Sequence, residues 1–237
     1  MKDLVLAIET SGAYVSAALV RRKASGRAEL LARADRRAPR GHAQRLLPAV
    51  ADLFRAAGAD PDDLGWVAVG VGPGSYTGLR VGIATALGLC AGDGPRPVAV
   101  PTLAAAAHGG GVRGRVAVVA EAGRGGLYVQ AFEWRRGEPA PRARGEPARL
   151  SAEELEPWLR AAGAPPTVVA VGAQAAAPAR ACGARVRVRT HASARSVAEL
   201  AIVSLEEEAR GHGQALAVAP IYLRPAAAAP GTGAAAG

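Results

Sequence analysis

The chain has 237 residues, of which 50% are hydrophobic and 21% charged, and this suits one large domain or two modest ones with a sizeable buried core. No window approaches the roughly twenty consecutive apolar residues of a membrane span, and the amino terminus lacks a secretory pattern, so we expect a cytoplasmic protein that does not involve a membrane. The net charge of +9 is almost entirely arginine, and the two cysteines predict no disulfide framework.

Residues 4–100 alternate buried-strand and amphipathic-helix patterns in the order βββαβα followed by a strand, which favours a ribonuclease-H-like fold. The first strand is a continuous apolar run. The first helix carries Leu46, Val50 and Leu53 on one stripe, and Gly58 ends it. The predicted elements are strands over 4–8, 13–20 and 30–33, a helix over 43–57, a strand over 67–71, a helix over 79–90 and a strand over 97–100.

A second set of elements follows Pro101. We expect one helix to begin at the cap residue Ser151, with Glu154 at the capping-box position, and a closing helix to pack back onto the first lobe. The predicted elements are strands over 116–120, 127–134 and 168–171 and helices over 152–162 and 196–209. The chain therefore divides into a first lobe over 1–103, a smaller second lobe over 104–225 and a tail over 226–237, which has no periodicity and which we expect to be flexible.

A glycine-rich loop follows the strand over 67–71, and Ser75 or Thr77 in it can cap the next helix. Its spacing excludes three enzyme motifs. Gly72 and Gly78 enclose five residues and no Lys follows, so it is no Walker loop. Thr77 stands where a dinucleotide fingerprint needs its third glycine, and Ser75 is not centred between glycines as in a nucleophile elbow.

The same loop reads GPGSYTGLRVG over residues 72–82 and resembles the signature of the TsaB (YeaZ-like) family of tRNA threonylcarbamoyladenosine biosynthesis proteins. Three further segments resemble that family in the same order: LVLAIETSG over 4–12, HAQRLLP over 42–48 and PIYLR over 220–224. The resemblance implies a two-lobed actin-like ATPase (ribonuclease-H-like) fold, an α/β architecture of mixed sheets flanked by helices. The chain departs from the family where Glu121-Ala122-Gly123-Arg124 replaces a usual Asp-Ala-Arg.

The first hairpin turn is the candidate nucleotide site. In actin-like ATPases this turn holds a carboxylate and hydroxylated residues near the phosphates, and here it contains Glu9, Thr10, Ser11 and Gly12. The alternative, a tight turn capped by its own hydroxyls, stays open. The second lobe offers no convincing second phosphate loop.

Metal chemistry is not predicted, because His42, His108, His191 and His212 are isolated, without the helical pair that holds a metal. The TsaD paralogue is known for such a pair, and by resemblance the equivalent site here has lost it. We therefore expect no metal site and no catalytic residue in this chain.

A docking surface is the other candidate site. Gly82, Ala84, Ala86 and Gly88 remove side-chain bulk from the helix over 79–90, so that another backbone can approach, although the helix can equally pack on its own sheet. The resemblance favours docking, because TsaB proteins pair with TsaD or with themselves through helices of the first lobe. The predicted partner-binding residues are His42, Leu46, Leu47, Val50, Ser75, Tyr76, Thr77, Arg80, Ile83, Ala86 and Leu87.

The resemblance implies a noncatalytic subunit that binds and activates TsaD, which holds the metal and modifies the adenosine beside the anticodon of tRNAs that read codons beginning with A. A TsaE-like ATPase is a further expected partner, the complex uses ATP, and this chain requires no cofactor. The chain alone forms a homodimer in this interpretation, and it meets tRNA only through the complex. The alternatives are an independent ATPase or small-molecule kinase and, least favoured, a peptidase.

Three arginines, Arg185, Arg187 and Arg189, alternate with valines, so a strand would present three guanidinium groups on one face. We favour an edge strand that its charges protect against self-pairing. A phosphate-contacting patch for tRNA is the alternative.

Overall fold

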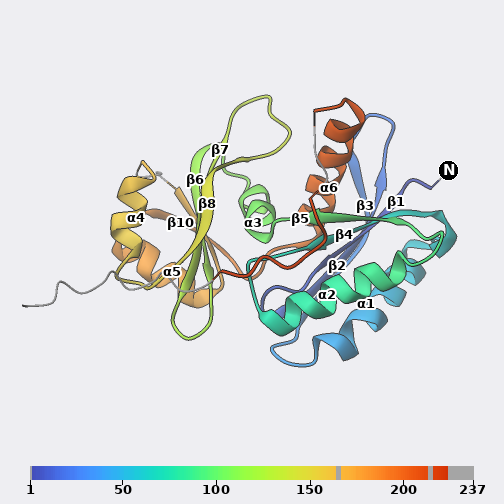
Figure 1. The fold of residues 1–237 in the computed structure, drawn as a ribbon, viewed down its shortest axis with the longest axis horizontal. Helices are drawn as coiled ribbons and strands as arrows, with labels where there is room; N and C mark the ends of the chain where they lie inside the picture. Colours follow the sequence, from blue (N-terminus) through green and yellow to red (C-terminus); the bar gives the residue numbers. More distant parts are fainter. Residues whose placement is uncertain (1, 164–166, 213–215, 224–237) are drawn as a thin grey trace, which may run out of the picture.

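The computed structural model describes residues 2–163, 167–212 and 216–223, so the predicted tail over 226–237 lies outside the described residues. Two five-stranded mixed sheets stand side by side, each flanked by helices (Figure 1). The predicted α/β architecture of two lobes is therefore present. Within the described ranges, no helix has the length and hydropathy needed to cross a membrane.

The first sheet has the order β3-β2-β1-β4-β5, in which β1 pairs antiparallel with β2 and parallel with β4. Every residue of β1 is buried, because helices cover both faces of the sheet. Leu6 and Ile8 pack towards α1 and α2, whereas Val5 and Ala7 pack towards α6. The elements are β1 (Leu4–Glu9), β2 (Tyr14–Arg22), β3 (Ala28–Arg37), α1 (His42–Ala57), a 3₁₀ turn (Pro61–Asp63), β4 (Leu64–Gly70), α2 (Tyr76–Leu89), β5 (Arg96–Val100) and α6 (Ala194–Ala209).

The second sheet has the order β10-β9-β6-β7-β8 and repeats the first, since in both sheets the first strand in the chain lies at the centre, between the second and the fourth. The helices α4 and α5 cover its outer face. The elements are α3 (Thr102–Gly110), β6 (Gly114–Glu121), β7 (Leu127–Trp134), β8 (Arg142–Leu150), α4 (Leu155–Ala161), β9 (Thr167–Val171), α5 (Ala173–Ala181) and β10 (Arg185–Arg189).

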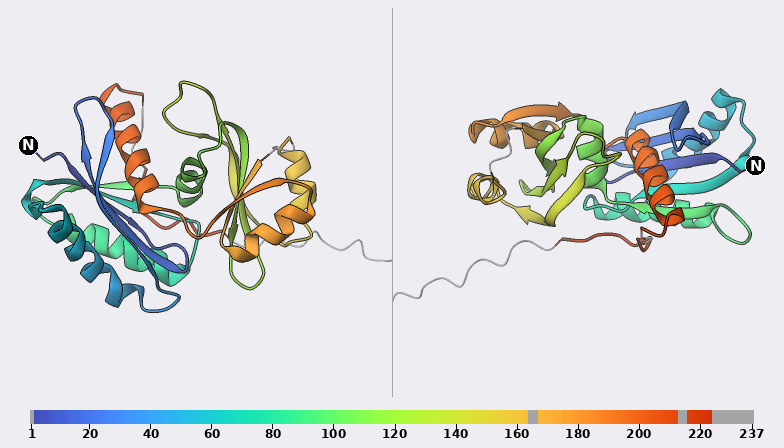
Figure 2. Two further views of the ribbon diagram at one scale, coloured as in Figure 1. Left: turned by 180° about the vertical axis from the view of Figure 1, so that it is seen from behind. Right: turned by 90° about the horizontal axis from the view of Figure 1, so that it is seen from above.

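The helix α3 joins the two lobes and lies between the sheets (Figure 2). Leu103 and Ala106 pack into the core of the second sheet, whereas Ala105 packs against α6 on the first. As expected, the closing helix α6 packs back onto the first lobe. The carboxyl-terminal part of the predicted second lobe thus belongs to the first lobe in space.

The described segment 216–223 crosses from α6 to the glycine loop and forms a strap along the first lobe (dark red in Figure 1). The Ile221 amide donates to the Val71 carbonyl at 2.7 Å. Tyr222 stacks on Tyr76 with ring centroids 5.1 Å apart, and its hydroxyl accepts from Arg80 Nε at 3.3 Å. The PIYLR segment therefore holds the glycine loop, although its last residue lies outside the described residues.

The structure confirms all the predicted strands and helices as elements but changes several boundaries. Gly58 ends α1 in the left-handed conformation, with φ of 57°. The helix α2 begins at Tyr76, three residues before the prediction, because the Ser75 hydroxyl accepts from the Gly78 amide at 3.3 Å. The prediction that Ser151 caps the helix is wrong, because α4 begins at Leu155 and Glu154 is its cap residue. The Glu154 carboxylate accepts a hydrogen bond from the Ser151 amide at 2.7 Å.

Candidate functional site

The turn after β1 packs directly against the glycine loop. The Ser75 amide donates to the Ser11 carbonyl at 2.7 Å, and Thr10 Oγ1 donates to the Gly78 carbonyl at 2.8 Å. A Cβ at Gly78 would overlap the Thr10 carbonyl oxygen, and one at Gly82 would overlap the Thr10 hydroxyl. These glycines are needed because two backbones approach closely.

Glu9 lies inside this turn and is only 2% exposed. Its Oε1 accepts from the Ser11 amide at 2.6 Å, and its Oε2 accepts from the Thr102 hydroxyl at 2.8 Å. The Thr102 hydroxyl in turn accepts from the Gly72 amide at 3.1 Å. Burial raises the pKa of Glu9, and the hydrogen bonds from Ser11 and Thr102 oppose the rise.

The sequence left two interpretations of this turn open: a nucleotide site, or a tight turn whose polar groups are hydrogen-bonded within the protein. The structure has the second arrangement. Glu9 and Thr10 are buried and engaged within the protein, so their side chains do not reach a ligand in this conformation. Only Ser11 and Gly12 of the four predicted nucleotide-binding residues line the pocket between the lobes. The sequence could not show this, because the burial depends on Gly70 and Thr102, which are remote in the chain.

The pocket between the lobes has a volume of about 70 Å³. Its first-lobe wall includes Ser11, Gly12 and Gly74, and its second-lobe wall includes Glu121 and His191. Pockets that hold drug-sized ligands measure about 300–1,000 Å³. A nucleotide therefore does not fit in this pocket, beside the turn after β1, as the lobes stand.

The second lobe has a related contact at the end of its own first strand, but the glutamate there is exposed. Glu121 lies at the end of β6, and its Oε1 accepts from the Gln174 amide at 2.7 Å, at the start of α5. Gly172 has φ of 92° and leaves room for this carboxylate, which a Cβ there would overlap. The start of α5, where free amides would suit a phosphate, thus already has an internal acceptor.

The histidines lie apart from one another. His42 Nε2 donates to the Gly12 carbonyl at 2.9 Å, which ties α1 to the first turn. His191 lies 2.9 Å from Asp35, and His108 lies 3.3 Å from Glu199. Among residues 2–163, 167–212 and 216–223, no three His, Cys, Asp or Glu side chains form a group that could hold a metal.

The predicted docking residues divide between the two sides of α1 and α2. Leu47, Tyr76 and Leu87 are 53%, 55% and 45% exposed, and Ser75, Thr77 and Arg80 are exposed as well. The other five predicted partner-binding residues are buried, and for them the prediction of an accessible surface is wrong. They are His42, Leu46, Val50, Ile83 and Ala86. Leu46, Val50, Ile83 and Ala86 belong to the helix faces that pack in the core of the first sheet, and His42 is bonded to the first turn.

The small residues of α2 divide in the same way. Gly82 and Ala86 face the sheet, whereas Ala84 and Gly88 are exposed. Tyr222, which the sequence did not single out, is exposed beside Tyr76, and only its place in the PIYLR segment marked it. We call the exposed set the α1–α2 face: Leu47, Tyr76, Arg80, Ala84, Leu87, Gly88 and Tyr222.

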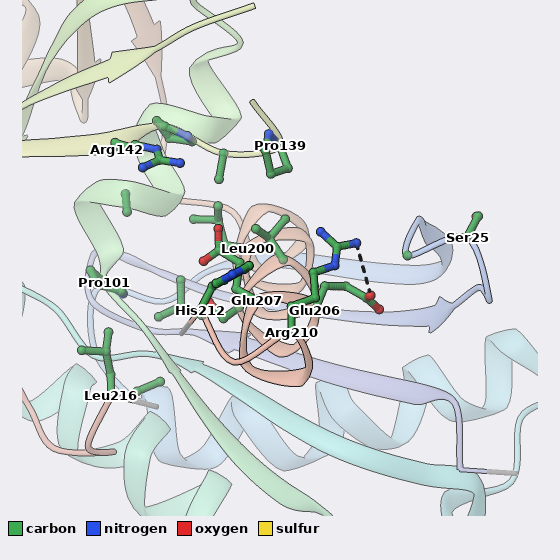
Figure 3. Close-up of a pocket in the computed structure, with 18 residues that line it drawn as sticks. Ser25, Pro101, Pro139, Arg142, Leu200, Glu206, Glu207, Arg210, His212 and Leu216 are labelled. Carbon is green, nitrogen blue, oxygen red and sulfur yellow. Dashed lines mark ion pairs between the residues drawn. The ribbon is translucent and has the colours of Figure 1, made fainter. Parts of the chain in front are cut away.

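A larger cavity of about 730 Å³ lies between α6 and the loop joining β7 to β8 (Figure 3). Leu200 on α6 and Arg210 just after it form one wall, and Pro139 in the loop and Arg142 at the start of β8 face them. Arg210 lies 4.0 Å from Glu206 in the same wall. Charges of both signs line this cavity, and none of the predicted site residues lies in it.

Comparison with known sequences finds similarity to proteins of tRNA threonylcarbamoyladenosine biosynthesis. The model of the family described as TsaD, tRNA N6-adenosine threonylcarbamoyltransferase, matches residues 35–140. The tRNA threonylcarbamoyladenosine biosynthesis protein TsaB of Escherichia coli is 44% identical over 71 residues, 30% of this chain and 31% of that protein. TsaB of Bacillus subtilis is 31% identical over 134 residues, 56% of each chain. The matched segments thus span about a third and about half of these two relatives.

A longer match is with an uncharacterized protein of Mycobacterium tuberculosis, 36% identical over 165 residues, 68% of this chain and 72% of the relative. Among solved structures, an uncharacterized protein with similarity to peptidase YEAZ from Pseudomonas aeruginosa has a TM-score of 0.71 and 29% identity, and covers 94% of this chain and 100% of its own. YeaZ from the same organism has a TM-score of 0.67 and 26% identity, and covers 93% and 100%.

The activator of 2-hydroxyisocaproyl-CoA dehydratase from Clostridium difficile, with bound ADPNP, has a TM-score of 0.52 and 11% identity over 90% of this chain and 100% of its own, a likeness of fold alone. The predicted fold class, a two-lobed actin-like ATPase (ribonuclease-H-like) fold, is confirmed. Because the similarity in sequence and fold runs through both lobes, the chain belongs to the TsaB (YeaZ-like) family.

Proposed function

We propose that the chain is a noncatalytic subunit for the synthesis of threonylcarbamoyladenosine in tRNA, which binds a TsaD-like transferase and activates it. The observation that carries this proposal is the α1–α2 face, where Leu47, Tyr76 and Leu87 stand exposed on helices of the first lobe. Aromatic side chains are enriched at protein–protein interfaces, and Tyr76 here stacks on the exposed Tyr222. The relatives of the chain that carry a functional name are TsaB proteins of this pathway.

The closed first turn supports a noncatalytic role. An actin-like ATPase must bring phosphates to the turn after β1, but here Glu9 is held by Ser11 and Thr102 within the protein. The pocket beside it, at about 70 Å³, is too small for a nucleotide. The independent ATPase or kinase would therefore need the lobes to open and the turn to rearrange.

The remaining parts of the proposal rest on the family resemblance, and the homodimer rests also on the apolar α1–α2 face. A TsaE-like ATPase is the further partner, and the complex consumes ATP while this chain requires no cofactor. Without the transferase, a second copy of the chain covers the apolar α1–α2 face, which gives a homodimer. Cytoplasmic tRNA reaches the chain as part of the complex.

The decisive experiment is modification of tRNA in vitro by the TsaD-like and TsaE-like proteins of the same organism, with and without this chain. We expect modification to depend on the chain. A transferase that works at full speed alone would overturn the proposal. ATP turnover by the isolated chain that Glu9→Gln abolishes would favour the ATPase instead.

Two substitutions test the surface itself. Leu47→Glu and Leu87→Glu place a charge where an apolar contact is expected, and together they should weaken pairing with the transferase at least about tenfold. Both side chains already face solvent, so the fold should survive. Leu216→Glu is the matched control, because Leu216 is 55% exposed and lines the cavity beside α6. Equal weakening by the control would remove the α1–α2 face from consideration.

A further inference from the structure

The two edges of the second sheet are both rich in arginine but differ in how the charge is balanced. On β8, Arg142 lies 3.3 Å from Glu138, and Arg144 lies 3.0 Å from Glu133. On β10, none of Arg185, Arg187 and Arg189 forms an ion pair with any carboxylate in the described part of the chain. The positive charge of β10 is therefore available to an external anion.

The three arginines of β10 share one face. Val186 packs in the core under α5, so the residues that alternate with it point away from that helix. Arg185, Arg187 and Arg189 are all exposed, and Arg187 Nη1 donates to the Gly110 carbonyl at 3.3 Å. Along a strand, alternate side chains repeat about every 6.6 Å, so the guanidinium groups form a row.

This row continues into a pocket that the first lobe completes. The pocket has a volume of about 300 Å³ and lies between Arg33 on β3 and Arg189 on β10, with Thr190 and Ser193 in its wall. Both strands are sheet edges, and they lie along the same side of the molecule (right-hand view of Figure 2). The two arginines thus face one pocket from different lobes.

The one acidic side chain among the residues that line this pocket is already engaged. Asp35 Oδ1 accepts from the Ser16 hydroxyl at 2.6 Å and lies 2.9 Å from His191 Nε2. The hydrogen bond from His191 lowers the pKa of Asp35. Asp35 Oδ2 also lies 3.9 Å from Arg33 Nε, so this carboxylate is shared among Ser16, His191 and Arg33. An anion that enters the pocket therefore meets Arg189 directly and competes with Asp35 for Arg33.

We propose that the row on β10 and the pocket at its end bind consecutive phosphates of an RNA backbone. Guanidinium groups bind phosphate oxygens through paired hydrogen bonds, and the hydroxyl of Ser193 can donate to the same group, whereas the Thr190 hydroxyl lies 3.0 Å from His191 Nδ1 and is already engaged. Three arginines along one strand, with a fourth in the pocket at its end, fit a polyanion better than a single phosphate. The proposal goes beyond the proposed function, because it gives this chain its own contact with tRNA.

The arginines of β10 could instead only protect the sheet edge against pairing with another strand. Edge protection and phosphate binding depend differently on the sign of the charge. Lysine or glutamate keeps an edge from pairing with another strand. Only a positive charge binds phosphate. Substitution by Lys and by Glu at the same three positions therefore separates them.

The experiment measures the affinity of the full chain, without partners, for a tRNA transcript by fluorescence anisotropy between about 50 and 200 mM salt. The chain with Glu at 185, 187 and 189 should bind weakly. For this variant, the slope of log K against log salt concentration should be less steep. We expect a change of about 0.9 for each arginine–phosphate pair that the substitutions remove, about 2.7 in all. This corresponds to a roughly 40-fold smaller decrease in affinity across that salt range. The Lys variant keeps the three positive charges, so it should keep the salt dependence of the natural chain and bind far more tightly than the Glu variant.

The matched control places Glu at Arg142, Arg144 and Arg149 on β8, which changes the net charge equally at the other edge of the same sheet. Equal weakening in both variants, or unchanged binding by the β10 variant, would overturn the proposal. Thermal melting checks that each variant is folded. The single variant Arg33→Glu, on the other lobe, should also weaken binding and keeps the test valid if a triple variant unfolds.

Two competitors identify the ligand. If polyglutamate at the same concentration of negative charge displaces tRNA, the surface binds an acidic protein and the RNA proposal is overturned. If millimolar AMP at constant ionic strength displaces tRNA, the surface binds a single phosphate group, and the RNA proposal is again overturned. Because the assay contains no transferase, its failure leaves the α1–α2 docking proposal untouched. Conversely, the Leu47 and Leu87 variants, which should no longer dock, should bind tRNA directly as the natural chain does.

Discussion

The two lobes share one strand order but treat the end of their central strand differently. In each, a glutamate ends the first strand of the sheet and lies against a glycine that ends or follows the fourth: Glu9 against Gly70, and Glu121 against Gly172. Glu9 is sealed, with a donor on each oxygen, whereas Glu121 is exposed and accepts from one amide of α5. The same topology thus supports a closed structural turn in one lobe and an open one in the other.

The outer surfaces differ in a corresponding way. The first lobe presents apolar side chains on α1 and α2, whereas the second presents arginines on β10 that form no ion pair among the described residues. Two lobes with the same strand order therefore have different surfaces: that of the first suits a protein partner, and that of the second suits a polyanion. The comparison can be tested at the paired glycines and glutamates.

The largest expected effect is at the glycines. Gly70→Ala should destabilise the fold by about 4 kcal/mol, because its Cβ would overlap a carboxylate that cannot leave the core. Gly172→Ala should cost less, about 1–3 kcal/mol, the cost of a backbone conformation that is essentially restricted to glycine, because the exposed Glu121 can move aside. Urea unfolding of both variants measures the difference. Equal destabilisation would contradict the distinction between a sealed and an open turn.

The glutamates should show a smaller contrast. Glu9→Ala leaves the Ser11 amide and the Thr102 hydroxyl without an acceptor inside the protein, which should cost about 3 kcal/mol. Glu121→Ala removes one bond to an exposed helix end and should cost about 1 kcal/mol. Thermal melting ranks the two. A Glu9→Ala variant as stable as Glu121→Ala would show that the sealed network contributes little.

The acidity of Glu9 gives the sealed turn a dependence on pH. Its pKa is raised by burial above the ordinary 4.5, so the folded state binds a proton that the unfolded state has released. This contribution to stability is complete below pH 4.5 and is lost as pH rises through the folded pKa. The difference in unfolding free energy between the natural chain and Glu9→Gln, followed from acid to neutral pH, should therefore decline. A difference independent of pH would contradict the assignment.

The smallest effect separates the two sides of α2. Gly88 is exposed and a Cβ there meets nothing within 4 Å, so Gly88→Ala should stabilise the chain by about 0.5 kcal/mol through helix propensity. Gly82→Ala, on the inner side, should destabilise it, because the Cβ overlaps the Thr10 hydroxyl. Melting temperatures that move in opposite directions would support the orientation of α2, and shifts of the same sign would contradict it.

Local patterns predicted the strands of both sheets well but missed α3, α5 and β8. The helices α3 and α5 are rich in alanine, so they lack the contrast between apolar and polar faces that predicts a helix. The strand β8 contains Arg142, Arg144 and Pro147 and reads as a loop, but pairing with β7 holds it in the sheet. In each case, contact with a remote element decided the structure.

The sequence by itself determined the order of the buried strands, the helix end at Gly58 and the family resemblance, because continuous apolar runs and a glycine cap act through neighbouring residues. Only the tertiary structure decided that Leu47 and Leu87 face outward while Leu46 and Ala86 face the core. It also decided that Glu9 is sealed against Gly70 and Thr102, and that Arg33 meets Arg189 across the lobes. These outcomes depend on pairs of residues far apart in the chain, and no local pattern carries that information.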